Sequence, residues 1–501
     1  MRKLVGSFRT TLLVAATGAA YLNMVPSAIA QPGDAGREPS QTDIDLRRRM
    51  EPLVPSIKAA LEGDNKDAQR ASLAIAADFP TGLAKAANLP AAIAGFLLRD
   101  KRDPELIALG VRALGRMQPA GADLAKVIGP FAKSESVVVR RAAAESLATA
   151  IQNSPPAQKA VPYAKYFIDI AGQALPLLND FLSDSDGETQ RFALAGIQNA
   201  THTITELFTY DPGPTADEPK IDVAGGRFAP LGPVLRAVGA AVPKLEAPLD
   251  AKEQDTRLSA ARTLEAIAIT RRTILNARPV GEPAPNDPFP GVWASMKPIL
   301  AKRLRDDSPH VRLAIVESLE SLGDALEARE LMRQAATDQV VFVRWTAARA
   351  LGRSAPAKPV AAAVADDVNT LAVLAADNDL DVRSAAVAAL GKYGAAAKSA
   401  SSVLLAAATR GDVEPRVVAI KALGAVETDA ERTVPVLIES LKDSDLRVSR
   451  VAATGLVRFG PAAKAALPEL RKAIQSTDPE LRLAAAEAIL AIEGRRPLKE
   501  L

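Results

Sequence analysis

Residues that commonly carry out chemistry are scarce in this chain of 501 residues. It contains two histidines, His202 and His310, and no cysteine, which excludes disulfides, thiolate nucleophiles, iron–sulfur clusters and a three-histidine zinc site. The motifs GxxxxGK(S/T), GxGxxG and GxSxG are absent as well. The sequence therefore predicts no catalytic residue, no cofactor and no metal. Carboxylates that meet only in three dimensions stay open as an alternative.

One acidic segment resembles the beginning of a calcium-binding loop. Asp184, Asp186 and Glu188 alternate with Ser185 and Gly187, but the twelve-residue spacing that ends in a Glu ligand is missing. Asp side chains at such positions accept hydrogen bonds from the first backbone N–H groups of a helix. We therefore expect a turn that caps the following helix.

The most regular chemical pattern is a pairing of aspartate with arginine. In several segments of similar sequence, an Asp lies six residues before an Arg. In one such segment another residue stands in place of the Arg. The residues of this predicted ladder are Asp306, Arg312, Asp338, Arg344, Asp377, Arg383, Arg416, Asp443 and Arg482. A row of Arg residues could instead bind phosphate. Each of these Arg residues has an Asp nearby in the sequence, however, and a planar guanidinium can form two hydrogen bonds with a carboxylate. We therefore interpret the ladder as structural.

A sequence repeat positions these residues. Copies such as DVRSAAVAAL at 381–390 and ELRLAAAEAI at 480–489 recur, and the last Arg positions follow one another at intervals of 33 residues, with Ser449 in one of them. Counted from the apolar residue before the Arg, apolar or small residues return at +3, +4, +7 and +8, the pattern of one helix face. An apolar segment, often with Pro near its start, precedes these copies, and Asp, Asn or Ser lies between the two. Each unit is therefore predicted to be a helical hairpin.

These motifs resemble the HEAT-repeat family, in particular the short repeats of bilin lyases, over about 294–493. The resemblance implies an all-α, armadillo-like α-solenoid, a superhelix of about eleven stacked helical hairpins. It also implies that the Asp and Arg rows stack between successive repeats, as at Arg312, Arg344 and Arg383. Degenerate copies extend the pattern upstream, with the Arg position at Arg70, Ile107, Arg140, Arg191 and Arg257.

Three successive intervals between Arg positions are longer than the rest, which places extra residues after the second helix, near 152–164, 209–230 and 278–291. Insertions in a solenoid fall in loops and often bind partners. These segments are rich in Pro and in aromatic residues. The candidate partner-binding residues are Tyr163, Tyr166, Phe208, Tyr210, Phe228, Phe289 and Trp293. The alternative is that their side chains pin the loops onto the helices beneath.

The beginning of the chain has the three parts of a secretory signal peptide. Three basic residues lie within the first nine, 10–25 is mainly apolar, and AIA at 28–30 is a small-x-small cleavage site. We expect cleavage after Ala30 and a location in the periplasm or outside the cell. The alternative, an uncleaved membrane anchor, requires ~20 apolar residues. Removal of three basic and no acidic residues takes the formal net charge from +3 to zero, which argues against a nucleic-acid partner.

The predicted organisation has five parts. They are a signal peptide (1–30), a disordered linker (31–42), degenerate HEAT repeats with three enlarged loops (43–292), regular HEAT repeats (293–494) and a C-terminal tail (495–501). The predicted function is that of an exported, non-catalytic scaffold that binds a protein partner through its concave face and the enlarged loops, with no integral membrane segment after cleavage. The alternative is an enzyme or a small-ligand binder, of tetrapyrrole type, with a groove near those loops.

Overall fold

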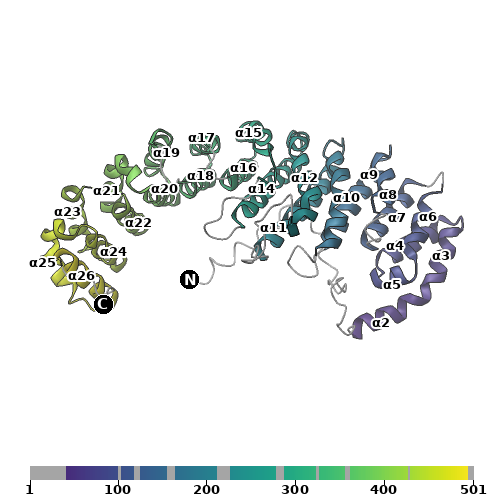
Figure 1. The fold of residues 1–501 in the computed structure, drawn as a ribbon, viewed down its shortest axis with the longest axis horizontal. Helices are drawn as coiled ribbons and strands as arrows, with labels where there is room; N and C mark the ends of the chain where they lie inside the picture. Colours follow the sequence, from purple (N-terminus) through teal and green to yellow (C-terminus); the bar gives the residue numbers. More distant parts are fainter. Residues whose placement is uncertain are drawn as a thin grey trace. The chain divides into compact units, whose positions relative to one another are not determined.

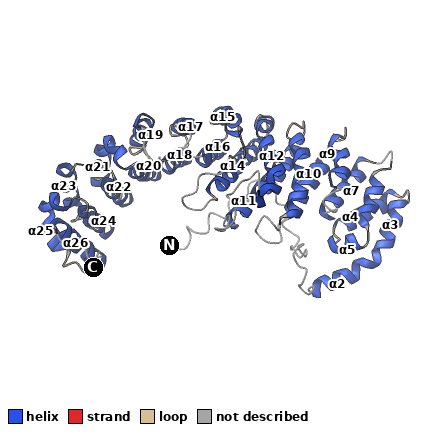
Figure 2. Ribbon diagram, in the orientation of Figure 1, coloured by secondary structure: helices blue, strands red, loops and turns tan. Residues whose placement is uncertain are grey.

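The structure is a computed structural model, and it describes residues 41–79, 81–99, 103–117, 124–154, 164–210, 226–277, 287–322, 326–355, 361–426 and 429–494. The regular secondary structure in these residues is all helical (Figure 2). Consecutive helices form about eleven hairpins, which stack within two compact units, Met1–Met296 and Lys297–Leu501. The predicted all-α solenoid of helical hairpins is therefore confirmed. The predicted signal peptide and C-terminal tail lie outside the described residues, and Gln41, assigned above to the linker, begins a helix.

Unit 1 holds the hairpins of the irregular part of the repeat (Figure 1). Its helices are α2 (Gln41–Met50), α3 (Val54–Glu62), α4 (Lys66–Ala77), α5 (Thr81–Ala86), α6 (Leu89–Leu97), α7 (Pro104–Met117), α8 (Leu124–Ile128), α9 (Val137–Gln152), α10 (Lys165–Phe181), α11 (Gly187–Tyr210), α12 (Gly232–Ala241), α13 (Glu246–Leu249) and α14 (Gln254–Asn276). Short 3-10 helices are η2 (Glu51–Leu53), η4 (Gly129–Lys133), η6 (Gly226–Leu231) and η7 (Val242–Leu245). The second helices α4, α7, α9, α11 and α14 pack in sequence against one another.

Unit 2 holds the regular hairpins, and α15 begins just before it (Figure 1). Its helices are α15 (Val292–Arg303), α16 (Pro309–Leu322), α17 (Leu326–Ala335), α18 (Val341–Arg353), α19 (Ala361–Leu374), α20 (Leu380–Lys392), α21 (Ser401–Thr409), α22 (Val413–Ala425), α23 (Ala430–Ser440), α24 (Leu446–Val457), α25 (Leu467–Ala473) and α26 (Pro479–Ile492). The 3-10 helices η8 (Gly394–Ala400) and η9 (Gly460–Ala466) precede α21 and α25. The second helices α16, α18, α20, α22, α24 and α26 pack side by side in that order.

The apolar period of the sequence forms the core between neighbouring helices. In α20, Val382, Ala386 and Leu390 are fully buried. The small residues let second helices approach closely, and the large ones fill the remaining space. The approach is closest at glycines: a Cβ on Gly352 of α18 would lie 2.9 Å from Cα of Ala389 in α20. The repeat therefore specifies both the helix faces and the spacing between them.

The enlarged units differ from the prediction because part of their extra length is helical. The second helices α11 and α14 have 24 and 23 residues, against 13 in α18. Their added turns pack on each other through hydroxyl groups, with Thr205 Oγ1 2.9 Å from Thr270 Oγ1. These turns contain several Thr residues, which favour the helical conformation only weakly. Tertiary packing of the two long helices overrides their weak helix propensity.

Candidate functional site

The Asp–Arg ladder joins successive hairpins of unit 2. Arg312 of α16 donates from Nε and Nη2 to the carboxylate of Asp338 in the next hairpin, at 2.6 and 2.9 Å. Its Nη1 donates to the carbonyl oxygen of Asp306 in its own turn, at 2.8 Å. Arg344 and Asp377 repeat the bidentate contact one hairpin further on, at 2.8 and 3.0 Å. Each Arg thus links the turn of its own hairpin to the turn of the next.

These ion pairs are charge-assisted and largely shielded from water. The side chains of Arg312 and Asp338 are 13% and 9% exposed. The hydrogen bond with Asp338 raises the pKa of Arg312, and the hydrogen bond with Asp377 raises the pKa of Arg344. Arg344 in turn holds the pKa of Asp377 below its usual value. The geometry therefore favours the ionised form of Arg344 and Asp377 alike.

Two acceptors of the ladder lie at positions that the sequence analysis did not select. Arg383 Nη2 lies 3.5 Å from Oδ2 of Asp412, and Arg450 donates from Nε to Oδ1 of Asp478 at 2.8 Å. Both Asp residues are helix N-caps, four residues before the Arg of their own hairpin rather than six. The preference for Asp at an N-cap is the signal that would have found them.

The remaining ladder positions differ in the partners that their side chains contact. Arg416 forms an ion pair with Asp443. Ser449 donates to the carbonyl oxygen of Asp443 at 3.2 Å, and the neighbouring Arg450 makes the contact to the next hairpin. Arg482 donates from Nη1 to two carbonyl oxygens of its own turn, at 2.9 and 3.0 Å. Within the described residues, Arg482 has no carboxylate of a following hairpin beside it.

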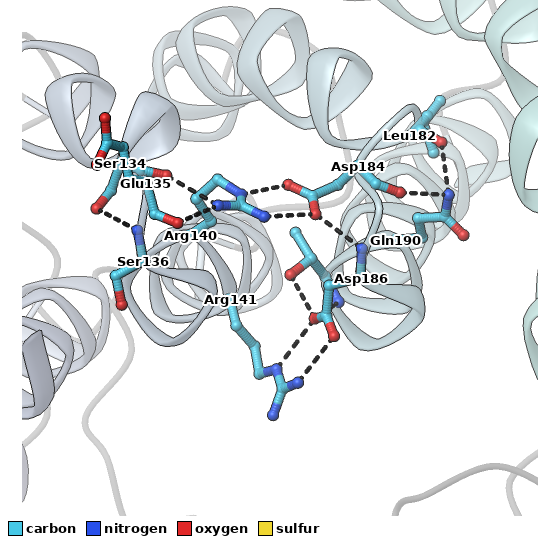
Figure 3. A network of polar contacts seen from close by, with 10 residues as sticks. Ser134, Glu135, Ser136, Arg140, Arg141, Leu182, Asp184, Asp186 and Gln190 are labelled. Carbon is cyan, nitrogen blue, oxygen red and sulfur yellow. Dashed lines mark hydrogen bonds and ion pairs between the residues drawn. The ribbon is translucent and has the colours of Figure 1, made fainter.

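The same bidentate contact between an Arg and an Asp of the next hairpin occurs in unit 1, at the acidic turn before α11 (Figure 3). Arg140 donates from Nε and Nη2 to Asp184 at 2.7 and 3.1 Å, and Arg141 donates likewise to Asp186 at 3.1 and 2.9 Å. Asp186 also accepts from the backbone N–H of Thr189 at 2.9 Å. Burial raises the pKa of Asp186, but its hydrogen bonds with Arg141 and Thr189 outweigh burial and lower the pKa to about 2. The acidic segment is therefore a turn and helix cap whose carboxylates are paired with guanidinium groups.

Two upstream Arg positions of the sequence analysis are wrong by one residue. Gln190 rather than Arg191 donates to the carbonyl oxygens that precede its helix, at 3.2 and 2.8 Å (Figure 3). Gln69 rather than Arg70 does the same at 2.6 Å. One residue is about 100° of rotation around a helix, so the adjacent side chain points elsewhere. An amide supplies the same N–H donor without the charge, which is why a search for Arg missed both.

A buried ionic cluster in unit 2 was not foreseen from the sequence. Asp367 of α19 is fully buried and accepts from Arg329 Nε and Arg333 Nη1 of α17, each at 2.7 Å. The hydroxyl of Tyr393 lies 3.0 Å from Oδ2 of Asp367 and from the carbonyl oxygen of Leu351. Burial raises the pKa of Tyr393. Tyr393 takes a position that is large and apolar in the following hairpins, as at Phe459, but Asp367 has Ala328 and Ala400 at the matching positions of the neighbouring hairpins. The repeat therefore does not predict a buried carboxylate there.

Two of the aromatic candidates are buried. Phe208 and Phe289 are 4% and 2% exposed. A Cβ on Gly239 of α12 would lie 3.6 Å from the ring of Phe289, and Arg271 of α14 holds the neighbouring Asp287 at 2.8 Å. This arrangement is the pinning of a loop end onto helices that the sequence analysis gave as the alternative. Phe208 and Phe289 therefore belong to the core.

The other aromatic candidates are spread over separate elements. Tyr166 and Trp293 are half-buried, on α10 and α15. Burial raises the pKa of Tyr166 to about 12. Tyr210 is the last residue of α11, Phe228 lies in η6, and Tyr163 lies outside the described residues. Their part in binding a partner stays a prediction.

A shallow depression of about 430 Å³ lies beside the end of α19 and along α21. Its lining residues are Ala375, Ala376, Ser402, Val403, Ala406, Ala407 and Arg410. It belongs to unit 2, whereas the three enlarged segments belong to unit 1. In the described ranges, no three His, Asp or Glu side chains are grouped so as to hold a metal ion. The described helices include none that is long and apolar enough to cross a membrane.

Residues 297–368 and 401–490 match a family model described as HEAT repeats. No curated protein matches the chain. Among solved structures, an engineered protein is 19% identical, with a TM-score of 0.49 over 88% of this chain and 98% of that one. Kap121p bound to Nup53p and Kap121p bound to the SUMO protease Ulp1p are 15% and 14% identical, each with a TM-score of 0.46 over 90% of this chain and 46% of theirs. The family match falls entirely within unit 2.

Proposed function

We propose that this chain, whose unit 2 is built of HEAT repeats, is a non-catalytic scaffold that binds another protein after export from the cytoplasm. The observation that carries the proposal is the layer of second helices in unit 2. These six helices pack side by side, and first helices cover one side of the layer. The other side presents one stripe of exposed and half-exposed side chains from each helix. Such a repeated, rigid surface suits a partner that spans several hairpins.

The charge of the chain supports a protein partner over a polyanion. Once the predicted leader is removed the formal net charge is zero, and many Arg residues are already paired with Asp in the ladder. A nucleic-acid surface needs an excess of free cations on one face. Export itself rests on the tripartite pattern of residues 1–30.

Affinity capture from the exported fraction with the full mature chain tests the proposal. Two double variants change the formal charge by the same amount on opposite layers. The second-helix variant is Ala388→Arg and Thr454→Arg, and the first-helix variant is Asn369→Arg and Ser402→Arg, all at exposed positions. Because these side chains point to solvent, both variants should keep the helical circular dichroism of the wild type.

We expect the second-helix variant to lose at least ten-fold in bound partner and the first-helix variant to retain it. A wild-type chain that recovers no partner would refute the scaffold function. If only the first-helix variant lost the partner, the binding surface would lie on the first helices, and the proposed surface on the second helices would be wrong.

A further inference from the structure

A group of aromatic residues lies on the open face of α18. Phe342, Trp345 and Arg349 follow one another at i, i+3 and i+7 and so share one side of the helix. The opposite side is core, with Val343 and Ala347 fully buried. The guanidinium carbon of Arg349 lies 4.3 Å from the centroid of the Trp345 ring, within the range of a cation–π contact. Trp345 is therefore held in place at the surface rather than in the core.

The group continues onto the neighbouring second helices. The ring of His310, in the first turn of α16, lies 5.7 Å from the ring of Phe342, measured between centroids. Val341 and Leu380, at matching positions of α18 and α20, are 40% and 38% exposed. We call the surface formed by His310, Val341, Phe342, Trp345 and Leu380 the α18 patch.

The repeat does not require this composition. The three positions that hold Phe342, Trp345 and Arg349 in α18 hold Asp381, Ser384 and Ala388 in α20. Only 4% of the chain is aromatic, and Trp345 is one of two tryptophans. Trp and Arg at the centre of a rigid surface are the residue types that supply most of the energy of protein interfaces.

The charges around the α18 patch are unbalanced. Asp307 and Asp381 are exposed and flank the patch on the hairpins of α16 and α20. Within the described residues neither carboxylate has an ion-pair partner. Beside the patch, Arg349 of α18 and Glu317 of α16 take matching positions and carry opposite charges. Asp307 and Asp381 therefore leave exposed negative charge at the edges of the patch, which favours a partner that carries positive charge.

We propose that the α18 patch docks a segment of the partner protein in which an aromatic or large apolar side chain is flanked by Lys or Arg residues. The inference rests on the proposed scaffold function and names the site within its second-helix layer. The apolar side chain packs against Phe342 and Trp345, and the flanking cations pair with Asp307 and Asp381. Because these carboxylates are exposed, salt weakens the charged part of the contact.

A random-sequence peptide library displayed on phage, selected on the full mature chain, tests the site. We expect enriched peptides to carry an aromatic or large apolar residue next to Lys or Arg. Their binding should fall at least ten-fold with Trp345→Ala and with Asp381→Lys, and it should survive in Leu483→Ala. Leu483 is a matched control, because it takes the position of Trp345 on α26 and is 54% exposed.

Tryptophan fluorescence gives a second readout. In a Trp293→Phe variant, Trp345 is the remaining tryptophan, so an enriched peptide should shift its emission. Enriched peptides flanked by acidic residues, or peptides that bind Trp345→Ala and Asp381→Lys as well as the wild type, would overturn the site. Asp381→Lys changes an exposed side chain, so its loss of binding is not a loss of folding.

The two proposals fail in different ways. If protein partners captured by the chain bind Trp345→Ala unchanged, the α18 patch is wrong and the scaffold function stands. If neither the exported fraction nor the library yields a ligand of the wild type, the scaffold function itself is wrong.

Discussion

At the residue scale, one guanidinium group of the ladder makes two kinds of contact, one within its own turn and one with the next hairpin. Nη1 of Arg344 satisfies carbonyl oxygens of its own turn, at 2.8 and 3.0 Å, while Nε and Nη2 bind Asp377 of the next hairpin. Gln190 donates to a carbonyl oxygen of its own turn, and so does Ser449, but neither side chain has the second donor edge that binds a carboxylate of the next hairpin. Arg is therefore the residue type that couples hairpins, because its planar donor fork has two usable edges.

The lowered pKa of Asp186 makes a pH-dependent contribution to stability. Its pKa is about 2 in the folded chain against an ordinary value of 3.8, so the contribution is present above pH 4 and is lost as the pH falls through about 2. We expect Asp186→Asn to lower the free energy of unfolding by about 2 kcal/mol at pH 7 and by about half of that at pH 3. Urea titrations of both proteins at the two pH values measure the difference. A difference that is the same at both would show that the charge of Asp186 is not its source.

The buried cluster around Asp367 predicts a large effect from a single carboxylate. Asp367→Ala leaves the buried Arg329 guanidinium without its partner, which should cost about 3–5 kcal/mol of stability. Asp366→Ala is the matched control: it removes the same charge from the adjacent, exposed position and should change stability by less than about 0.5 kcal/mol. Thermal unfolding of the two variants checks the contrast, and equal melting temperatures would contradict the burial of Asp367.

At the element scale, successive second helices pack against one another, and small residues decide how closely they approach. A Cβ on Gly115 of α7 would lie 2.7 Å from Cα of Ser146 in α9, whereas a Cβ on Gly172 of α10 would meet nothing within 4 Å. The hydroxyl of Ser146 also donates to the carbonyl oxygen of Val111 across this contact, at 2.8 Å. The same substitution should therefore have opposite signs at the two glycines.

We expect Gly115→Ala to destabilise unit 1 by about 1–3 kcal/mol, because backbone atoms of α9 must move. Gly172→Ala should stabilise it by about 0.5–1 kcal/mol through higher helix propensity. Urea unfolding monitored by circular dichroism measures both. The close packing of α7 and α9 would be refuted if Gly115→Ala were as stable as Gly172→Ala.

At the scale of the whole molecule, the hairpins contact mainly their neighbours in sequence, so stability is local and each unit has its own core. The α18 patch and the ladder share unit 2 without competing, because the ladder lies in the turns and the patch on the open helix face. A surface of this kind can bind a partner without any rearrangement of the core beneath it.

The signal peptide predicted over residues 1–30 can be tested by the mass of the exported protein. We expect the exported protein to start at Gln31, since AIA at 28–30 meets the small-residue requirement of the cleavage site. Intact-mass measurement of the protein from the exported fraction checks this. A mass that includes Met1 would reject the predicted location, and replacing Ala30 by a large charged residue should block processing.

The sequence by itself determined the helical hairpin, its repeat and the residue types of the ladder. These follow from local rules: a 3.6-residue apolar period, helix-capping residues in the turn, and the recurrence of both at a fixed interval. Only the tertiary structure decided which carboxylate each Arg meets, as with Asp412 and Asp478, and that Gln69 and Gln190 replace Arg. It also decided that Asp367 is buried among cations and that Trp345 is half-exposed rather than part of the core. These outcomes depend on the rotation of a side chain about its helix and on the neighbour that approaches it, and residues far apart in the chain set both.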